Sequence, residues 1–202
     1  MLLVHSFVDC LPEELSTLQG RLAFEIITCD NTSRETEHQT LEANLVGLLE
    51  RYEPELFIFT GQAPSYNKIT IEKIAINSFM REIIDADRPV AYWSNLPGTE
   101  SLGAVLENHE IPACYSFYAG EHLCNHILYS SLYFAEKNNL PHKSGFLHVP
   151  LLPEQVTRLY RDSPYMPIEI SRKALSLVIN HVVELYSHSK ALQLTSESSG
   201  RI

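Results

Sequence analysis

Short apolar runs alternate with longer segments of helical periodicity along most of the chain. Runs that predict strands occupy residues 2–7, 22–28, 56–60, 112–117 and 145–149. Helices are predicted near residues 12–18 and over residues 99–108, 121–137 and 171–186. Because strands alternate with helices, we expect an α/β fold with three layers, α/β/α, around a mainly parallel or mixed sheet.

A longer helix is predicted to begin near Thr32 or Ser33 and to end at Pro54. Its start carries a candidate capping box, Thr32-x-x-Glu35, in which the two side chains bond each other's backbone N–H groups. The apolar positions that keep one face are Leu41, Leu45, Leu48, Leu49 and Tyr52. The continuous apolar run over residues 56–60 is typical of a central parallel strand covered on both faces.

The segment 69–77 interrupts its own alternation. Apolar residues stand at positions 69 and 71 and resume at 74 and 76, so the phase slips at Glu72-Lys73. A β-bulge at that point is predicted, and it would turn the side chain of Glu72 to a new direction.

The composition indicates one globular domain. A chain of 202 residues with 45% hydrophobic and 20% charged residues is near globular averages, and we expect a single domain over residues 1–187. The polar segment 188–202 has no apolar period and is predicted to be disordered. The net charge of −10, with no basic cluster longer than Arg172-Lys173, argues against nucleic acid as a partner.

The N-terminal residues and the cysteines indicate a cytoplasmic protein. Residues 1–9 have no basic region, and no apolar run approaches the roughly 18 residues that a membrane span needs. We therefore expect a cytoplasmic location and no membrane association. The four cysteines, at positions 10, 29, 114 and 124, form no C-x-x-C pair, which argues against a disulfide framework or a zinc site.

Cys124 is the cysteine with a reactive setting. It follows a strand and the turn at residues 118–120 and falls in the first turn of the predicted helix. Unpaired N–H groups and the helix dipole favour a thiolate there. The alternative is an inert buried thiol, the usual state of a cysteine, and Cys10, Cys29 and Cys114 keep that interpretation.

His148 and Glu72 are candidate partners for this thiol. His148 lies at the carboxyl end of a predicted strand, the edge where α/β sheets bind ligands, and a neutral imidazole is the usual base for a thiol. Glu72 is a candidate to orient and polarise that imidazole. The alternatives are a surface or core histidine, since there are nine, and a solvated glutamate.

Four segments together resemble the pyroglutamyl-peptidase I (pyrrolidone-carboxylate peptidase) family. GQA at residues 61–63 and ITIEKIAIN at 69–77 are similar to the family's GQA and glutamate-bearing ERVAIN segments at the same spacing. AGEHLCNH at 119–126 is similar to its CNH nucleophile segment, and SGFLHVPLLPEQ at 144–155 to its histidine segment. AYWSNLP at 91–97 adds a further match.

The resemblance implies a cysteine peptidase that removes N-terminal pyroglutamyl residues from peptides without a cofactor or metal. It makes Cys124 the nucleophile, His148 the general base and then acid, and Glu72 the partner of His148. The substrate-binding residues that it implies are Phe7, Gln62, Leu123 and Arg81. Association into a homo-oligomer is a further expectation, since family members often associate.

The first loop departs from the family pattern, which reads roughly TGFEPFGG. Phe7 survives there, while the second aromatic position is Cys10, and residues 64–66 replace a Gly-Gly-Arg segment. Two alternatives therefore stay open. One is a family-like binding or regulatory module without turnover, and the other is a cysteine hydrolase that acts on another cyclic amide or peptide end.

Overall fold

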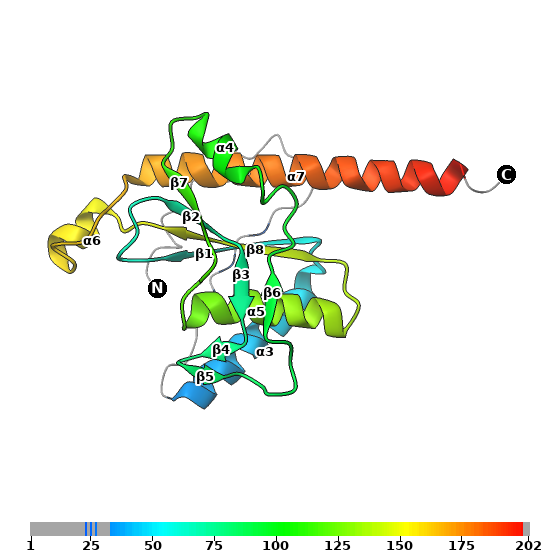
Figure 1. Ribbon diagram of the computed structural model, residues 1–202, viewed down its shortest axis with the longest axis horizontal. Helices are drawn as coiled ribbons and strands as arrows, with labels where there is room; N and C mark the ends of the chain where they lie inside the picture. The colour runs from blue at the N-terminus through cyan, green and yellow to red at the C-terminus, as the bar shows by residue number, and fades with distance from the viewer. Residues whose placement is uncertain (1–22, 24, 26, 28–32, 200–202) are drawn as a thin grey trace.

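The computed structural model describes residues 23, 25, 27 and 33–199, with side chains as far as residue 193 (Figure 1). The strand predicted over 2–7 and the helix over 12–18 lie outside this part, as does Phe7. The strand predicted over 22–28 falls outside it as well, apart from three isolated positions.

The main sheet is mixed. Its strands lie in the order β1 (Leu56–Gln62), β8 (Lys143–Val149), β2 (Ile69–Glu72) and β7 (Ala113–Ser116). β1 runs parallel to β8, and β2 runs parallel to β7, but β2 and β8 are antiparallel. β1 was predicted to be a covered central strand. Among the described strands of this sheet it instead lies at one edge, and of its residues only Phe59 is buried.

Helices cover both faces of this sheet, which confirms the α/β fold with its three layers (Figure 1). On one face, α4 (Leu102–Glu107) and α7 (Ile168–Ser199) bury their apolar sides against β2 and β8; we name this group the α7 cluster. On the other face, α3 (Arg34–Tyr52) and α5 (Leu123–Lys137) pack on Phe59 and Phe146; we name this group the α5 cluster.

The helix α3 begins one residue after its cap. The hydroxyl of Ser33 accepts the N–H of Thr36 at 3.1 Å, so Ser33 is the capping residue that the structure describes. Leu41 and Leu45 are buried in the α5 cluster. The helix ends at Tyr52, before the predicted stop at Pro54, because Glu53 adopts a left-handed backbone conformation.

The predicted interruption at Glu72-Lys73 is a change of sheet, not a bulge. The chain leaves the main sheet after β2, and β3 (Ile74–Ile76) pairs instead with β6 (Ala91–Trp93). Lys73 lies between the two strands; its N–H donates to the carbonyl of Ser116, and its carbonyl accepts from the N–H of Ser94. The buried Lys73 ammonium pairs with the exposed Glu100.

Some short elements were not predicted from the sequence. A short hairpin joins β4 (Ser78–Phe79) to β5 (Glu82–Ile83), and α6 (Pro153–Arg158) follows β8. The helix predicted over 99–108 is shorter in the structure, since residues 97–100 form turns before α4. Within the described part of the chain, no helix has both the length and the apolar character needed to cross a bilayer.

The last helix is longer than its apolar face. We predicted that it would end at Tyr186 and that a disordered segment would follow, whereas α7 continues to Ser199. Lys190 pairs with Glu55, and the hydroxyl of Ser189 donates to the carbonyl of Leu185, so polar contacts continue past the apolar stripe. Figure 1 shows this end of α7 extending beyond the sheet. The division into a domain over 1–187 and a tail stays a prediction.

Candidate active site

The antiparallel pairing of β2 with β8 brings Glu72 to His148. Thr70 is the direct partner of His148, and Glu72 is the partner of Phe146, so Glu72 and His148 share one face of the sheet. The Nδ1 atom of His148 lies 2.7 Å from Oε1 of Glu72. Both side chains are almost completely shielded from water, with Glu72 0% and His148 5% exposed.

Cys124 reaches the same face from the start of α5. His122 occupies the cap position and Leu123 the first helical position, so Cys124 stands second in the helix. The N–H of a residue at that position has no partner within the helix and points out from its end. The thiol interacts with the imidazole of His148 and is among the groups that raise its pKa. Since Nδ1 is held by Glu72, Nε2 is the ring nitrogen left for the sulfur.

These contacts set the charge of His148. Burial lowers the pKa of the imidazole, but the hydrogen bonds with Cys124 and Glu72 outweigh this effect and raise it to about 9. At neutral pH the ring is therefore an imidazolium held between sulfur and carboxylate. The second carboxylate oxygen of Glu72, Oε2, is buried without a hydrogen-bond partner in the described part of the structure.

Gly61 makes room for the sulfur. It is the register partner of His148 on β1. A Cβ atom built at Gly61 would lie 2.9 Å from the sulfur of Cys124 and 2.9 Å from Cζ of Phe146, closer than real contacts of this kind. The sequence marked this position only as the first residue of the GQA segment, which gave no reason to place it beside the thiol.

Tyr66 is a site residue that the sequence analysis did not assign. Its ring meets that of His148 edge-on, with the centroids 5.4 Å apart. Burial, and next the charge of Glu72, raise the pKa of its hydroxyl. Tyr66, Thr70, Tyr115 and Ser116 line part of a cavity of about 270 Å³ beside the triad. The signal was its place in the segment 64–66 after GQA, where the chain departs from the family pattern.

The comparison with known families agrees with this geometry. The sequence model described as pyroglutamyl peptidase matches residues 18–185, which is most of the chain. The chain belongs to the pyroglutamyl peptidase family. The match includes the three segments that carry Glu72, Cys124 and His148, whereas Phe7 lies before it.

Curated relatives in the pyroglutamyl peptidase family cover about two thirds of the chain. A pyrrolidone-carboxylate peptidase of Thermococcus litoralis is 35% identical over 147 residues, which are 65% of this chain and 66% of that protein. The chain thus spans just under two thirds of that relative's length. A pyrrolidone-carboxylate peptidase of Bacillus mycoides is 35% identical over 149 residues, 68% of each chain.

Solved structures of the family share the fold. Pyroglutamyl peptidase I from Bacillus amyloliquefaciens superposes with a TM-score of 0.66 at 28% identity, over 71% of this chain and 72% of that one. Pyrrolidone carboxyl peptidase from Pyrococcus furiosus gives a TM-score of 0.67 at 32% identity, over 72% and 76% of the respective chains.

Of the four family-implied substrate residues, Leu123 lies next to the thiol, and Gln62 contacts the segment that follows β8. Leu123 directly precedes Cys124 and packs against the α5 cluster. The amide of Gln62 exchanges hydrogen bonds with that of Gln155, at 2.8 and 2.9 Å, and donates to the carbonyl of Pro150 at 3.2 Å. These bonds fix the end of β1 to the segment that follows β8.

Arg81 is placed apart from the triad. Its side chain is 87% exposed, and its Nε donates to a carboxylate oxygen of Glu121 at 3.1 Å. Glu121 belongs to the turn that leads into Cys124, so the contact of Arg81 is with the approach to α5. Phe7, the fourth substrate residue, lies outside the described residues.

Asn125 anchors the helix that carries the thiol, a role that we did not assign from the sequence. Its Oδ1 accepts the N–H of Ile76 at 2.9 Å, and its Nδ2 donates to the carbonyls of Ile76 and Ser78. The residue is fully buried. The sequence indication was the asparagine of the CNH segment, directly after the cysteine. A polar amide on a helix face that packs in the core needs hydrogen-bond partners, so an anchoring role could have been predicted.

Proposed function

We propose that the protein is a cysteine peptidase that removes an N-terminal pyroglutamyl residue from peptides. The observation that carries the proposal is the connected set Cys124, His148 and Glu72 in a chain of the pyroglutamyl peptidase family. The relatives named above are pyrrolidone-carboxylate peptidases, and the family match over residues 18–185 includes all three residues.

In the first half of the reaction, the sulfur of Cys124 attacks the carbonyl carbon of the pyroglutamyl residue. The carbonyl oxygen becomes an oxyanion, which the free N–H of Cys124 at the helix start stabilises. His148 then gives its proton to the leaving amine, the C–N bond breaks, and the shortened peptide departs. A thioester of pyroglutamate on Cys124 remains.

In the second half, His148 is neutral and serves as the base. It takes a proton from water, whose oxygen attacks the thioester carbonyl and displaces the sulfur. Pyroglutamate leaves, and the proton on His148 again faces the thiolate. Throughout, the carboxylate of Glu72 holds Nδ1–H, which keeps the ring oriented and stabilises its positive charge.

The decisive experiment is hydrolysis of a pyroglutamyl reporter by the purified protein and its Cys124→Ala variant. We expect turnover by the first and none by the second, with equal melting temperatures, because one small side chain replaces another at a helix start. Cys114→Ala is the matched cysteine control and should keep its activity. Equal activity in all three proteins excludes a thiol mechanism at Cys124.

We assign the substrate contacts from the family resemblance and, for the three described residues, from the contacts given above. Leu123 and Phe7 are proposed to contact the pyroglutamyl ring, and Gln62 to hold the edge of the pocket through Gln155. Arg81 is proposed to act through Glu121 on the turn before Cys124, as a positioning residue.

A second candidate is a cysteine hydrolase that acts on another cyclic amide or peptide end. Tyr66 favours it, since this ring lies against His148 in the segment where the chain departs from the family. Rates on pyroglutamyl, prolyl and alanyl reporters separate the two candidates. The assembled triad favours turnover over the alternative of a binding module.

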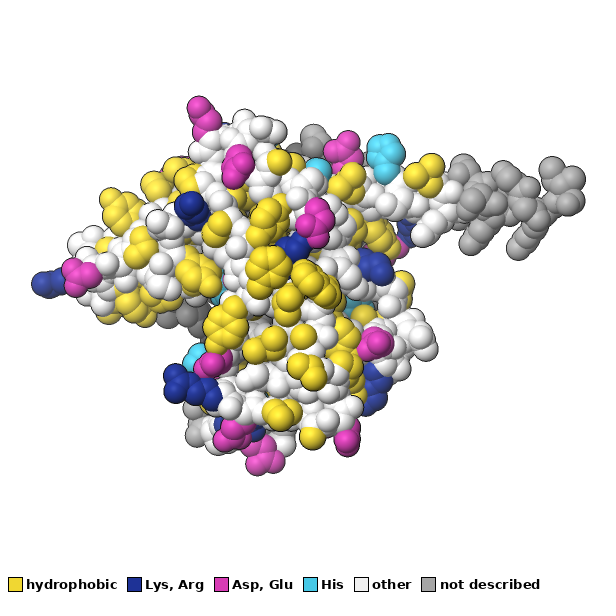
Figure 2. Space-filling view, in the orientation of Figure 1, with side chains coloured by type: hydrophobic (Ala, Val, Ile, Leu, Met, Phe, Trp, Pro, Cys, Tyr) yellow, Lys and Arg dark blue, Asp and Glu magenta, His cyan; other side chains and the backbone are white. Residues whose placement is uncertain are grey.

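Two further features of the whole protein are proposals. Free thiols at Cys114 and Cys124 support a cytoplasmic location. Exposed aromatic rings at Trp93 and Phe117, which meet edge-on, support association into a homo-oligomer. Figure 2 shows hydrophobic side chains gathered over the middle of the face that it presents.

A further inference from the structure

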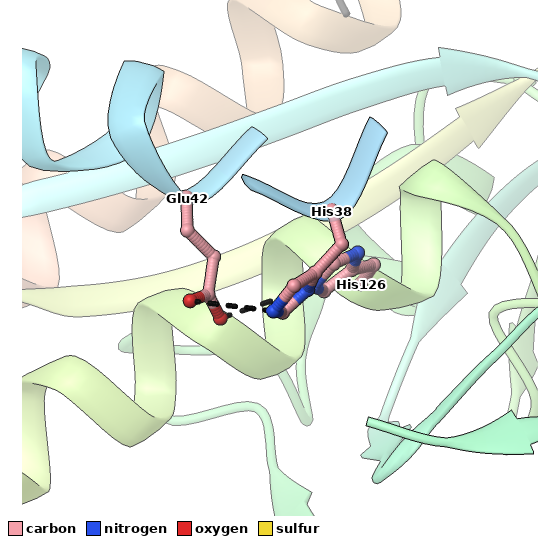
Figure 3. A group of neighbouring side chains, drawn as sticks. All are labelled: His38, Glu42 and His126. Atoms are coloured by element: carbon pink, nitrogen blue, oxygen red, sulfur yellow. Dashed lines mark hydrogen bonds and ion pairs between the residues drawn. The ribbon is translucent and has the colours of Figure 1, made fainter. Parts of the chain in front are cut away.

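Away from the triad, three of the described side chains gather the donor atoms of a metal site (Figure 3). His38 and Glu42 stand one turn apart on α3, and His126 faces them from α5. We propose that His38, Glu42 and His126 bind a divalent transition-metal ion, for which zinc is the best fit, and that the ion ties α3 to the first turns of α5.

The spacing of the donor atoms suits a tetrahedral ion. Nδ1 of His38 lies 2.9 Å from Nε2 of His126, and Nε2 of His126 lies 3.8 Å from Oε1 of Glu42. Nε2 of His38 is 3.8 Å from Oε2 of Glu42. Zinc bonds of about 2.0 to 2.1 Å in tetrahedral geometry need neighbouring donors about 3.3 to 3.4 Å apart. With one donor atom from each residue, the three donor atoms lie within 4.8 Å of one another, so the side chains must move closer together to complete the site.

The donor types select the ion. Two imidazoles and one carboxylate form a common protein ligand set for zinc, with water in the fourth position, whereas magnesium and calcium prefer oxygen donors alone. No cysteine belongs to the cluster.

The packing holds one ligand and leaves the others accessible. His126 is fully buried, its ring 4.6 Å from that of Phe79, and its Nδ1 has no hydrogen-bond partner among the described residues. Nε2 is the ring nitrogen that faces the cluster, where it lies 2.9 Å from Nδ1 of His38, so an ion must replace this contact between the two rings. The side chains of His38 and Glu42 are 26% and 17% exposed, which leaves a route for an ion.

The positive charge of Arg88 competes with an ion for the carboxylate of Glu42. Its Nη1 lies 2.7 Å from Oε1 of Glu42, and the hydroxyl of Ser130 donates to the same oxygen at 2.9 Å. Oε2, the oxygen nearer His38, has only the longer 3.5 Å contact with Nη2 of Arg88. A positive charge this close weakens cation binding. Removal of that charge should therefore tighten binding, a result that a purely structural hydrogen-bond network does not predict.

The proposed metal site is connected to Cys124 through α5, which carries both Cys124 and His126. His126 stands two residues after Cys124, and α3 packs on α5 in the α5 cluster. An ion bound there would link the start of α5 to α3, so it would raise stability without taking part in the chemistry. Its detection consequently needs no enzymatic assay.

The experiment measures zinc binding and melting temperature in the Cys124→Ala protein, which removes the thiolate as a competing ligand. We expect a saturable rise in melting temperature with zinc chloride and a titration stoichiometry of one ion per chain. His38→Gln and Glu42→Gln, each in the same background, should weaken binding by at least about tenfold. Arg88→Gln should strengthen it by several-fold.

His109→Gln is the matched control, since His109 is an exposed histidine on another part of the surface. It should leave the zinc response unchanged. Each variant is compared with and without zinc, so a loss of stability in the variant itself does not obscure the result. The proposal is overturned if zinc leaves the Cys124→Ala protein unchanged, or if its effect survives both His38→Gln and Glu42→Gln.

Discussion

The sulfur of Cys124 occupies space that a side chain at Gly61 would take. For Gly61→Ala, the new methyl group would lie 2.9 Å from both that sulfur and Phe146, so one of them must move. Displacement of a reacting atom by about 1 Å costs on the order of 100-fold in rate. We expect kcat on the pyroglutamyl reporter to fall by about that factor, with a stability loss of about 1 to 3 kcal/mol.

Gly47→Ala is the matched control for this substitution. Gly47 lies in α3, and a Cβ atom there meets nothing within 4 Å. Alanine is the better helix former, so this variant should be slightly more stable and fully active. Equal activity of the two glycine variants would contradict the role assigned to Gly61.

The charge of His148 predicts a pH dependence. Its pKa is raised to about 9. In the proposed mechanism, the protonated ring is the form that donates to the leaving amine. Activity, measured as kcat/KM, should therefore fall as the pH rises through about 9. The same raised pKa contributes stability that is fully present below its ordinary value of 6.5 and is lost as the pH rises through about 9.

Glu72→Gln tests the cause of this shift. The substitution removes the negative charge that helps to raise the pKa of His148, so the alkaline limb of kcat/KM should move to lower pH. Because Glu72 contacts the ring and not the substrate, kcat should fall more than KM rises. Glu107→Gln, an exposed position on α4, is the control. A Glu72→Gln profile identical to the wild-type one would remove Glu72 from the mechanism.

At the scale of elements, α5 is held in place by Asn125. The Asn125→Ala substitution removes three hydrogen bonds, to Ile76 and Ser78, and leaves buried backbone groups unpaired. We expect a loss of about 2 to 4 kcal/mol in the free energy of unfolding, measured by denaturant titration, and a lower kcat because the start of α5 shifts.

The matched control is at the opposite end of the same helix. The amide of Asn138 donates to the carbonyl of Phe134 in an exposed position. Asn138→Ala should cost less than about 1 kcal/mol and leave kcat unchanged. A similar loss in both variants would mean that Asn125 contributes only ordinary helix stability.

Local patterns identified the elements that carry the site but not their pairing. The apolar run ending at His148 and the Gly turn before Cys124 lie close to the observed β8 and α5. The antiparallel direction of β2 against β8, and the departure of the chain at Lys73 to a second sheet, depend on partners far away in the sequence. Alternation of apolar residues contains no information about such partners.

The same distinction applies to single residues. The pattern made Cys124 a candidate from its place at a helix start, His148 from its place at a strand end and Glu72 from the phase slip. The roles of all three needed the family resemblance, because neighbours in sequence do not distinguish a reactive thiol from an inert one or a buried glutamate from a solvated one. The contacts of Tyr66 and Gly61 with the triad required three-dimensional distances.

For the whole molecule, the two apolar clusters lie on opposite faces of the sheet, so a substitution in the cluster away from the triad should lower stability without changing the turnover rate. The triad lies on the side of the α5 cluster, whereas Leu106 is buried in the α7 cluster on the opposite face. Leu106→Ala should cost about 2 to 5 kcal/mol of unfolding free energy through the lost contacts and the cavity. We expect kcat per folded molecule to stay unchanged below the lowered melting temperature. A proportional loss of kcat would show that the two faces are coupled.

The antiparallel contact between β2 and β8 also sets when the protein becomes active as it folds. Glu72 and His148 are 76 residues apart in the chain, so their contact requires closure of a long loop, whereas α5 forms from neighbouring residues. In a refolding chain, α5 with Cys124 should therefore form before His148 and Glu72 reach their places beside the thiol. Recovery of hydrolysis should lag behind recovery of helical circular dichroism, and an incompletely folded chain should leave peptides around it uncut.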